Sequence, residues 1–228
     1  MFPYLDVSEA EVKSFANVVV TIERVGQVIT HNQPSKRTLE AVTIALRFLQ
    51  DHEHLTLTDI GFCECMAFGA EAVCYASAFG IPNLLSIELT EESKRLASIY
   101  IKLLHGDKLI NYRLSIIVSR FQERMGIDAE VNYLDLAHTG DLDEGVILVC
   151  FLNCCRKLLP GNYAIVLARA TEINLEDYSC DCLDLVLHSV VAKGTPFVGN
   201  MFLFKRKNMD TDSLTTLVAK STIQSVRK

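Results

Sequence analysis

Three acidic residues fall at the predicted ends of strands, and their spacing suggests a binding site for a nucleotide-like ligand. Asp59 and Gly61 open a tight turn after a strand predicted from Leu55 to Ile60, Glu88 ends a second strand, and Asp135 lies at the end of a third. The carboxyl ends of parallel strands meet at one sheet edge. Carboxylates there accept hydrogen bonds from ribose hydroxyls, and a helix N-terminus offers unpaired N–H groups.

The elements that would position these residues alternate between helices and strands. An N-terminal helix is predicted over about Ser8 to Val28, and Ser35 caps a second helix with Leu39, Val42, Ala45, Leu46 and Leu49 on one face. Small residues after Gly61 predict a helix, Thr90 caps another that runs to about Leu104, and a further helix carries Leu114, Ile117, Val118, Phe121 and Met125.

The later strands complete the predicted sheet. They cover Ala129 to Leu136, about Val146 to Phe151, Tyr163 to Ala168, a stretch around Leu183 to Leu187, and Asn200 to Lys205. This order predicts an α/β fold: a Rossmann-like, mostly parallel sheet with an antiparallel C-terminal hairpin and helices on both faces. We divide the chain into an N-terminal helical layer (1–54), the α/β core (55–207) and a basic tail with a possible helix (208–228).

Composition and charge bear on partners and compartment. The chain has 228 residues, half of them apolar, and a net charge of −6. The stretch from residue 205 onward carries +4, which leaves −10 for the remainder. An acidic body disfavours nucleic acid and favours a protein substrate or partner. Neither a targeting signal nor a membrane span is apparent, so we expect the cytoplasm or nucleus.

The eight cysteines are read as thiols in a reducing compartment. The pairs Cys63/Cys65, Cys154/Cys155 and Cys180/Cys182 are closer together than structural zinc ligands usually are. We therefore expect no metal site and interpret these residues as small buried hydrophobes. A redox or metal role for Cys63-x-Cys65 stays open as an alternative, because thiols at a helix N-terminus become reactive.

With these features the chain resembles the class I S-adenosylmethionine-dependent methyltransferases. The matching pieces are Asp59-x-Gly61, Glu88, Asp135, the run Leu158 to Gly161 and the closing hairpin. Within that class it is most similar to the non-SET (silencing-disruptor type) histone lysine methyltransferases. That resemblance rests on the helical layer before the first strand, the pair Asp135-Leu136, Asn153 after the fourth strand, and Gly194-x-Pro196.

The resemblance implies S-adenosylmethionine as cofactor. The turn would hold its methionine part, Glu88 its ribose hydroxyls and Asp135 its adenine amino group. The residues implied in cofactor binding are Asp59, Gly61, Phe62, Cys63, Cys65, Glu88, Leu89, Asp135, Leu136 and Asn153. The resemblance names no catalytic residue, and Tyr133, His138 and Asn153 are candidates near the predicted edge.

The cofactor turn departs from the family pattern Asp-x-Gly-x-Gly-x-Gly at two positions. Cys63 and Cys65 stand where glycines are usual. A Cβ there costs about 1 kcal/mol or more in strain, or blocks the close approach of a ligand. Two functions therefore remain open: an active methyltransferase, and an inactive methyltransferase-like protein that serves as a binding or scaffold subunit.

Overall fold

The computed structural model describes residues 36–67, 70–88, 90–98 except 92 and 96, 113–118, 129–136, 158–169, 183–195 and 198–207. Several predictions fall outside these ranges, among them the first helix, the strand at 146–151 and the helix of the tail. The same holds for the predicted site residues Leu89 and Asn153 and for the catalytic candidate His138.

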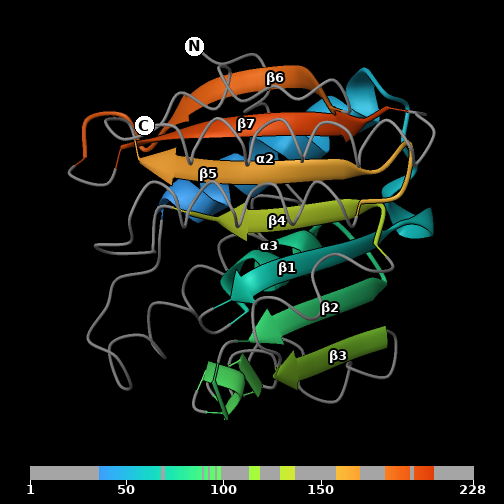
Figure 1. Ribbon diagram of the computed structural model, residues 1–228, viewed down its shortest axis with the longest axis vertical. Helices are drawn as coiled ribbons and strands as arrows, with labels where there is room; N and C mark the ends of the chain where they lie inside the picture. The colour runs from blue at the N-terminus through green and yellow to red at the C-terminus, as the bar shows by residue number, and fades with distance from the viewer. Residues whose placement is uncertain are drawn as a thin grey trace, which may run out of the picture.

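The described chain builds one sheet of seven strands in the order β3-β2-β1-β4-β5-β7-β6 (Figure 1). Strands β1 to β5 run parallel, and β7 is antiparallel to both β5 and β6. The predicted fold class, a mostly parallel sheet with an antiparallel C-terminal hairpin, is confirmed. The strands are β1 (Gly61–Ala67), β2 (Asn83–Glu88), β3 (Arg113–Val118), β4 (Val131–Asp135), β5 (Tyr163–Arg169), β6 (Leu183–Val191) and β7 (Gly199–Arg206).

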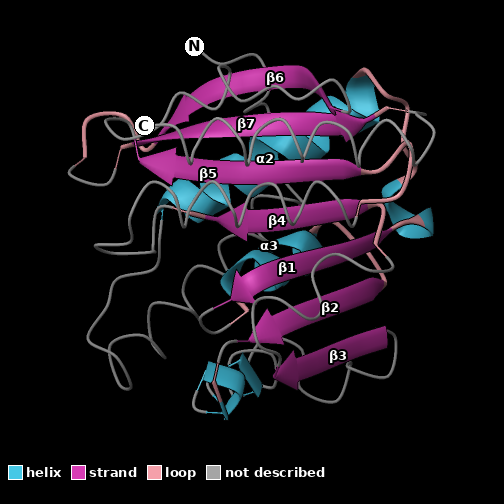
Figure 2. Ribbon diagram, viewed as in Figure 1, coloured by secondary structure: helices cyan, strands magenta, loops and turns pink. Residues whose placement is uncertain are grey.

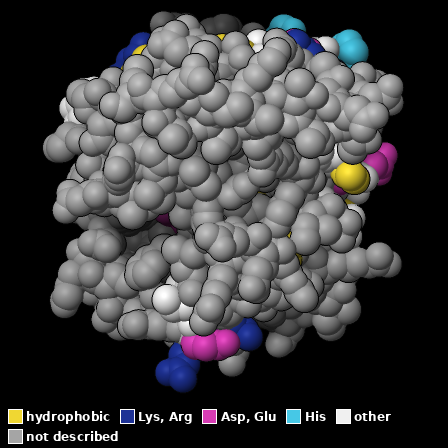
Figure 3. All heavy atoms as spheres, viewed as in Figure 1, with side chains coloured by type: hydrophobic (Ala, Val, Ile, Leu, Met, Phe, Trp, Pro, Cys, Tyr) yellow, Lys and Arg dark blue, Asp and Glu magenta, His cyan; other side chains and the backbone are white. Residues whose placement is uncertain are grey.

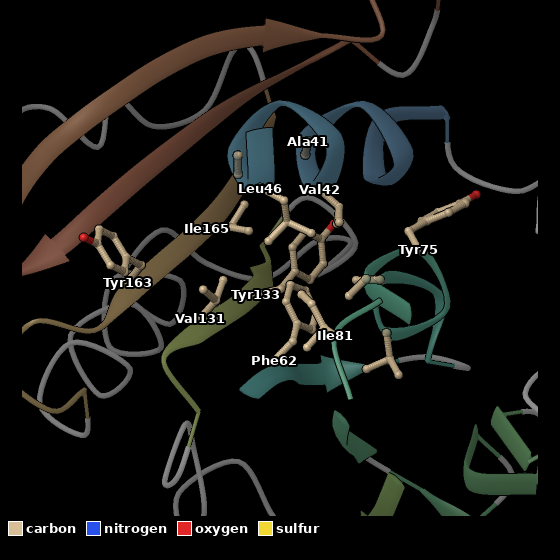
Figure 4. Packing of buried hydrophobic residues seen from close by; sticks show 14 of the residues in the cluster. Ala41, Val42, Leu46, Phe62, Tyr75, Ile81, Val131, Tyr133, Tyr163 and Ile165 are labelled. Atoms are coloured by element: carbon tan, nitrogen blue, oxygen red, sulfur yellow. The ribbon is translucent and has the colours of Figure 1, made fainter. Parts of the chain in front are cut away.

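Helices α2 (Lys36–Asp51) and α3 (Glu71–Ala78) cover the same face of the sheet (Figure 2). The apolar positions of α2 recur at helical spacing, as predicted, and its Val42, Leu46 and Leu49 are fully buried. They share one core with Phe62 of β1, Tyr133 of β4 and Ile165 of β5. Figure 4 shows Tyr133 between Phe62 and the α2 side chains Val42 and Leu46. This packing places the start of α2 over the ends of β4 and β5 and the start of β7.

A third helical segment follows β2 at the position predicted from Thr90. The Thr90 hydroxyl accepts a hydrogen bond from the Ser93 N–H at 3.0 Å, which is the predicted N-terminal cap. The segment lies at the lower end of Figure 1, where Figure 3 shows charged side chains of both signs next to one another. Lys94 and Glu91 form an exposed ion pair there at 3.9 Å. Such a pair adds little stability.

The predicted bounds of the first strand are wrong. Residues Leu57–Asp59 form a 3₁₀ turn, and the strand is Gly61–Ala67, which the sequence analysis assigned to the turn and the helix after it. The alternating Leu-Thr-Leu-Thr run imitates an amphipathic strand. The actual strand is central in a parallel sheet and is buried on both faces, so it shows no apolar-polar alternation.

A second correction concerns Arg113–Val118, which is strand β3 and not part of a helix. Its apolar residues happen to fit a helical period as well as a buried strand. The strand pairs with β2 in parallel, with Glu88 opposite Val118. Asp135 therefore ends the fourth strand and not the third, and it lies on the other side of β1 from Glu88.

Candidate functional site

The carboxyl edge of the sheet brings together Glu88, Asp135 and the end of β1, which lies between them. Ala67 is opposite Glu88 in the β1–β2 register, and Cys65 is opposite Leu134 in the β1–β4 register. The order of the strands reverses between β1 and β4, and open α/β sheets bind ligands at such a point. Two strand spacings separate Glu88 from Asp135, roughly 10 Å.

Asp59 and Gly61 lie at the opposite, amino edge. Asp59 is exposed in the 3₁₀ turn before β1, and the Gly61 N–H donates to the carboxylate of Glu130, which precedes β4. Figure 1 shows the start of β1 on the right of the view and the arrowheads of β1, β2 and β4 on the left. The structure thus separates Asp59 and Gly61 from Glu88 and Asp135. Their predicted role as a cofactor turn loses its geometric basis.

Glu64 replaces Asp59 as the acidic residue of the first strand. It is the middle residue of β1, is 5% exposed, and accepts a hydrogen bond from the Val73 N–H at 3.0 Å. Burial, and next the charge of Glu88, raise the pKa of Glu64 well above its usual range, while the N–H groups of Val73 and Ala72 oppose that rise. A carboxyl group of β1 thus occupies the N-terminus of α3.

Glu88 is fully buried on the same face of the sheet as Glu64. Its Oε1 accepts a hydrogen bond from the Ser86 hydroxyl at 2.7 Å, and Ser86 is opposite Glu64 in the register. The predicted position of Glu88 at the end of the second strand is confirmed. Its carboxylate is directed toward the α3 side, where a ligand crossing the ends of β1 and β2 would meet it.

Asp135 pairs with Arg37, which comes from the first turn of α2. Arg37 Nη2 lies 3.8 Å from Asp135 Oδ2, and their side chains are 8% and 12% exposed. The stem of Arg37 crosses the start of β7 at Gly199, where an added Cβ would lie 2.9 Å from Arg37 Cδ and 3.0 Å from the Ala168 carbonyl oxygen. Gly199 therefore leaves the space that Arg37 occupies.

Tyr133 faces α2 from β4 and is buried. Its hydroxyl donates to Thr38 Oγ1 at 3.3 Å, one residue after Arg37. Burial is the largest cause that raises the pKa of Tyr133 well above its usual range, followed by the charge of Asp135. The phenol is thus neutral and ties α2 to β4, so it is a structural group and not a catalytic base in this conformation.

The remaining predicted site residues lie inside the sheet. Phe62 belongs to the core beneath α2, while Cys63 and Cys65 are buried on the opposite face with their Sγ atoms 3.7 Å apart. Leu136 is buried and its N–H donates to the Leu167 carbonyl at 2.9 Å. Within the described ranges no three His, Cys, Asp or Glu side chains cluster as a metal site, and neither do any of the described cysteines form a disulfide.

Sequence reasoning missed two residues of this edge. For Glu64 a signal existed, because it is a single acid within an apolar run, and an acid that such a run buries needs a hydrogen-bonding partner. Ala70 takes a left-handed conformation (φ 55°) at the start of α3, which marks the true strand-to-helix turn. For Arg37 we find no comparable signal, because only the tertiary packing of α2 brings it to Asp135.

Comparisons with known proteins support this architecture. No protein-family model matches the sequence, and no curated protein matches it significantly. By structure the chain is similar to the N-methyltransferase NodS from Bradyrhizobium japonicum in complex with S-adenosyl-L-homocysteine, with a TM-score of 0.55 and 12% identity over 82% of this chain and 98% of NodS.

Two further solved structures are similar at comparable levels. The Bacillus subtilis m1A22 tRNA methyltransferase TrmK has a TM-score of 0.52 and 12% identity over 75% of this chain and 66% of TrmK. A protein of the NADB-Rossmann superfamily from Streptococcus agalactiae has a TM-score of 0.55 and 11% identity over 80% of this chain and 72% of that protein. At these identities the comparisons show the fold, which is that of the class I methyltransferases. They give no support for the narrower resemblance to non-SET histone lysine methyltransferases.

One negative finding concerns membranes. Among the helices in the described ranges, none combines the length and apolar character that a membrane crossing needs.

Proposed function

We propose that this protein is an S-adenosylmethionine-dependent methyltransferase. The observation that carries the proposal is the placement of Glu88 and Asp135 at the ends of β2 and β4, on either side of the point where the strand order reverses. The class I methyltransferase fold supports the same function. The cofactor supplies a methyl group on a positively charged sulfur, and the enzyme accelerates its transfer mainly by holding donor and acceptor in line.

The residues present fit such a cofactor. Glu88 is a carboxylate at the end of the strand next to β1, suited to accept hydrogen bonds from two ribose hydroxyls. The carboxyl groups of Glu88 and Asp135 favour a ligand that carries positive charge. With Glu88 as the ribose partner, the adenosine lies toward β2 and β3. Asp135, on the far side of β1, then belongs to the methionine and acceptor end, so we no longer assign it to the adenine.

We further propose that the acceptor is a protein. The net charge of −6 supports this choice, because an acidic body repels the phosphates of nucleic acids. The tRNA methyltransferase among the similar structures makes RNA the direct competitor. Tritiated S-adenosylmethionine incubated with the protein and a cell lysate separates the two: we expect label that protease removes and ribonuclease does not. Label removed by ribonuclease would contradict a protein acceptor.

Isothermal titration calorimetry with S-adenosylmethionine and S-adenosylhomocysteine tests the function itself. We expect both to bind, and Glu88→Gln to weaken both by about tenfold or more, because an amide replaces a charged acceptor. The unfolding temperature of the variant, measured in parallel, establishes that it is folded. No binding to the wild-type protein at millimolar ligand would overturn the proposal.

A scaffold or binding subunit is the second candidate function. One observation favours it: Glu64, Glu88 and Asp135 already have intramolecular partners in Val73, Ser86 and Arg37. A ligand must compete with or add to these contacts. The same calorimetry decides between the two functions, since a pure scaffold leaves the cofactor unbound.

A further inference from the structure

We propose that Arg37 binds the carboxylate of the methionine part of S-adenosylmethionine. The inference rests on the proposed function and deepens it, because it assigns a binding residue that comes from α2 and not from the strand-to-helix turn after β1. Three observations carry it: the occupied N-terminus of α3, the position of Arg37, and the charge of the edge.

The first observation is that α3 does not offer its N–H groups to a ligand. Glu64 Oε2 accepts the Val73 N–H at 3.0 Å, and the side chain of Glu64 is buried. In a dinucleotide-binding fold such N–H groups hold the anionic part of the ligand. Here a carboxyl group of the protein already fills that position. The carboxylate of a bound amino acid must therefore find its partner elsewhere at this edge.

The second observation is the position of Arg37. Of the charged groups in the described ranges, the two buried cations are Arg37 and Arg206. Arg206 lies at the amino edge, where its N–H donates to the Asn162 carbonyl, whereas Arg37 lies beside Asp135 at the end of β4. Packing over Gly199 holds the stem of Arg37, so its guanidinium is positioned before any ligand arrives.

The third observation is the charge of the edge. Glu88 and Asp135 favour the ammonium and sulfonium groups of the cofactor but oppose its carboxylate. A guanidinium has five N–H donors in a planar fork, so one arginine can serve Asp135 and a second carboxylate together. Arg37 thus allows a zwitterionic ligand to bind beside the acidic side chains of Glu88 and Asp135. Asp135 remains beside the guanidinium and is placed to accept a bond from the ligand's ammonium group.

A pair of probes that differ only in the carboxylate tests this assignment. Calorimetry is performed with S-adenosylmethionine and with decarboxylated S-adenosylmethionine on the wild-type protein and on Arg37→Met, which keeps an aliphatic side chain over Gly199. We expect the variant to bind S-adenosylmethionine about tenfold or more weakly and the decarboxylated form with unchanged affinity, within about twofold. Arg37→Lys keeps the charge and loses the planar fork of donors. Its affinity for S-adenosylmethionine should lie between those of the wild-type protein and Arg37→Met.

Arg47→Met is the matched control. Arg47 lies on the same helix, 5.9 Å from the centre of the Phe79 ring, and its removal changes the net charge equally. It should leave both affinities unchanged. Equal weakening of both probes in Arg37→Met, or no weakening of either, would overturn the role of Arg37 while leaving the proposed function intact. A wild-type protein that binds neither probe would overturn both.

Discussion

Glu64 and Glu88 lie on the same face of neighbouring strands, and both are buried between the sheet and α3. The charge of Glu88 is the second cause, after burial, that raises the pKa of Glu64. Two buried carboxyl groups that interact in this way are hard to ionise together. The neutral form of Glu64 is therefore favoured in the folded protein.

The pH dependence of stability should report this pair. The folded-state pKa of Glu64 is raised, so the native protein binds its proton more tightly than the unfolded chain does. Its contribution to the free energy of unfolding is complete below the unfolded pKa of about 4.3 and is lost as the pH rises through the folded pKa. Glu64→Gln removes this loss. Urea unfolding at several pH values should show a smaller decline for the variant than for wild type.

Glu91→Gln serves as control, because Glu91 is exposed at the start of the helix after β2. It should reproduce the wild-type pH dependence. A Glu64→Gln protein that declines as steeply as wild type would contradict a protonated, buried Glu64.

The contribution of Glu53 to stability should depend on pH in the opposite direction. Glu53, two residues after α2, accepts a hydrogen bond from the Tyr163 hydroxyl at 2.6 Å and pairs with Lys205, so α2 is joined to β5 and β7. The hydrogen bond from Lys205, and next that from Tyr163, lower the pKa of Glu53 from 4.5. Its contribution to stability is present above the unfolded pKa and is lost as the pH falls through the folded pKa.

Tyr163→Phe tests this junction. Loss of the hydroxyl should cost about 1 kcal/mol of unfolding free energy at pH 7. The difference between variant and wild type should shrink as the pH falls through the lowered pKa of Glu53, because a protonated Glu53 is a weaker acceptor for the Tyr163 hydroxyl. Denaturant melts at pH 7 and at the lowest pH at which the protein stays folded measure both values. A difference that is the same at the two pH values would rule out Glu53 as the partner that matters.

Gly199 should tolerate no side chain. In Gly199→Ala the new Cβ lies 2.9 Å from Arg37 Cδ and 3.0 Å from the Ala168 carbonyl oxygen, so the arginine or the strand must move. We expect a loss of about 1–3 kcal/mol in unfolding free energy. Because part of that loss comes from Arg37, the double variant with Arg37→Ala should lose less than the sum of the two single variants.

Gly194→Ala is the comparison for this prediction. Gly194 has φ +75° and no atom within 4 Å of the added Cβ, so only backbone strain of about 1 kcal/mol applies. Its effect should add to that of Arg37→Ala without coupling. Coupling as large as that of Gly199 would mean that the contact with Arg37 does not explain the result.

The sequence predicted the parts of the fold that have a clear period or cap. The α2 helix, the cap at Thr90, the strand at Asp135 and the closing hairpin all appear as expected. Each has an apolar pattern that only one kind of element satisfies, or a capping residue with its partner at the right distance.

The first half of the sheet could not be predicted in the same way. Strand β1 lies inside the parallel sheet, where burial on both faces erases alternation, and the apolar residues of β3 fit a helical period as well as a strand. The position of β1 in the sequence then decided the site: with the strand at 61–67 and not at 55–60, its acidic residue is Glu64, and Asp59 lies before the strand. The Arg37–Asp135 pair joins residues 98 positions apart in sequence and depends on the packing of α2.

A ligand bound at the carboxyl edge of the sheet and a ligand bound at the amino edge would respond differently to a substitution of Asp59, so this residue distinguishes the two locations. Asp59 lies exposed in the turn before β1, at the edge away from Glu88 and Asp135. Asp59→Asn should leave the affinity for S-adenosylhomocysteine unchanged within about twofold, whereas Asp135→Asn should weaken it because Asp135 is placed beside the methionine part. Calorimetry on the two variants measures both effects with the same substitution. If Asp59→Asn weakened binding and Asp135→Asn did not, the ligand would lie at the amino edge, and the site built around Glu88 would be wrong.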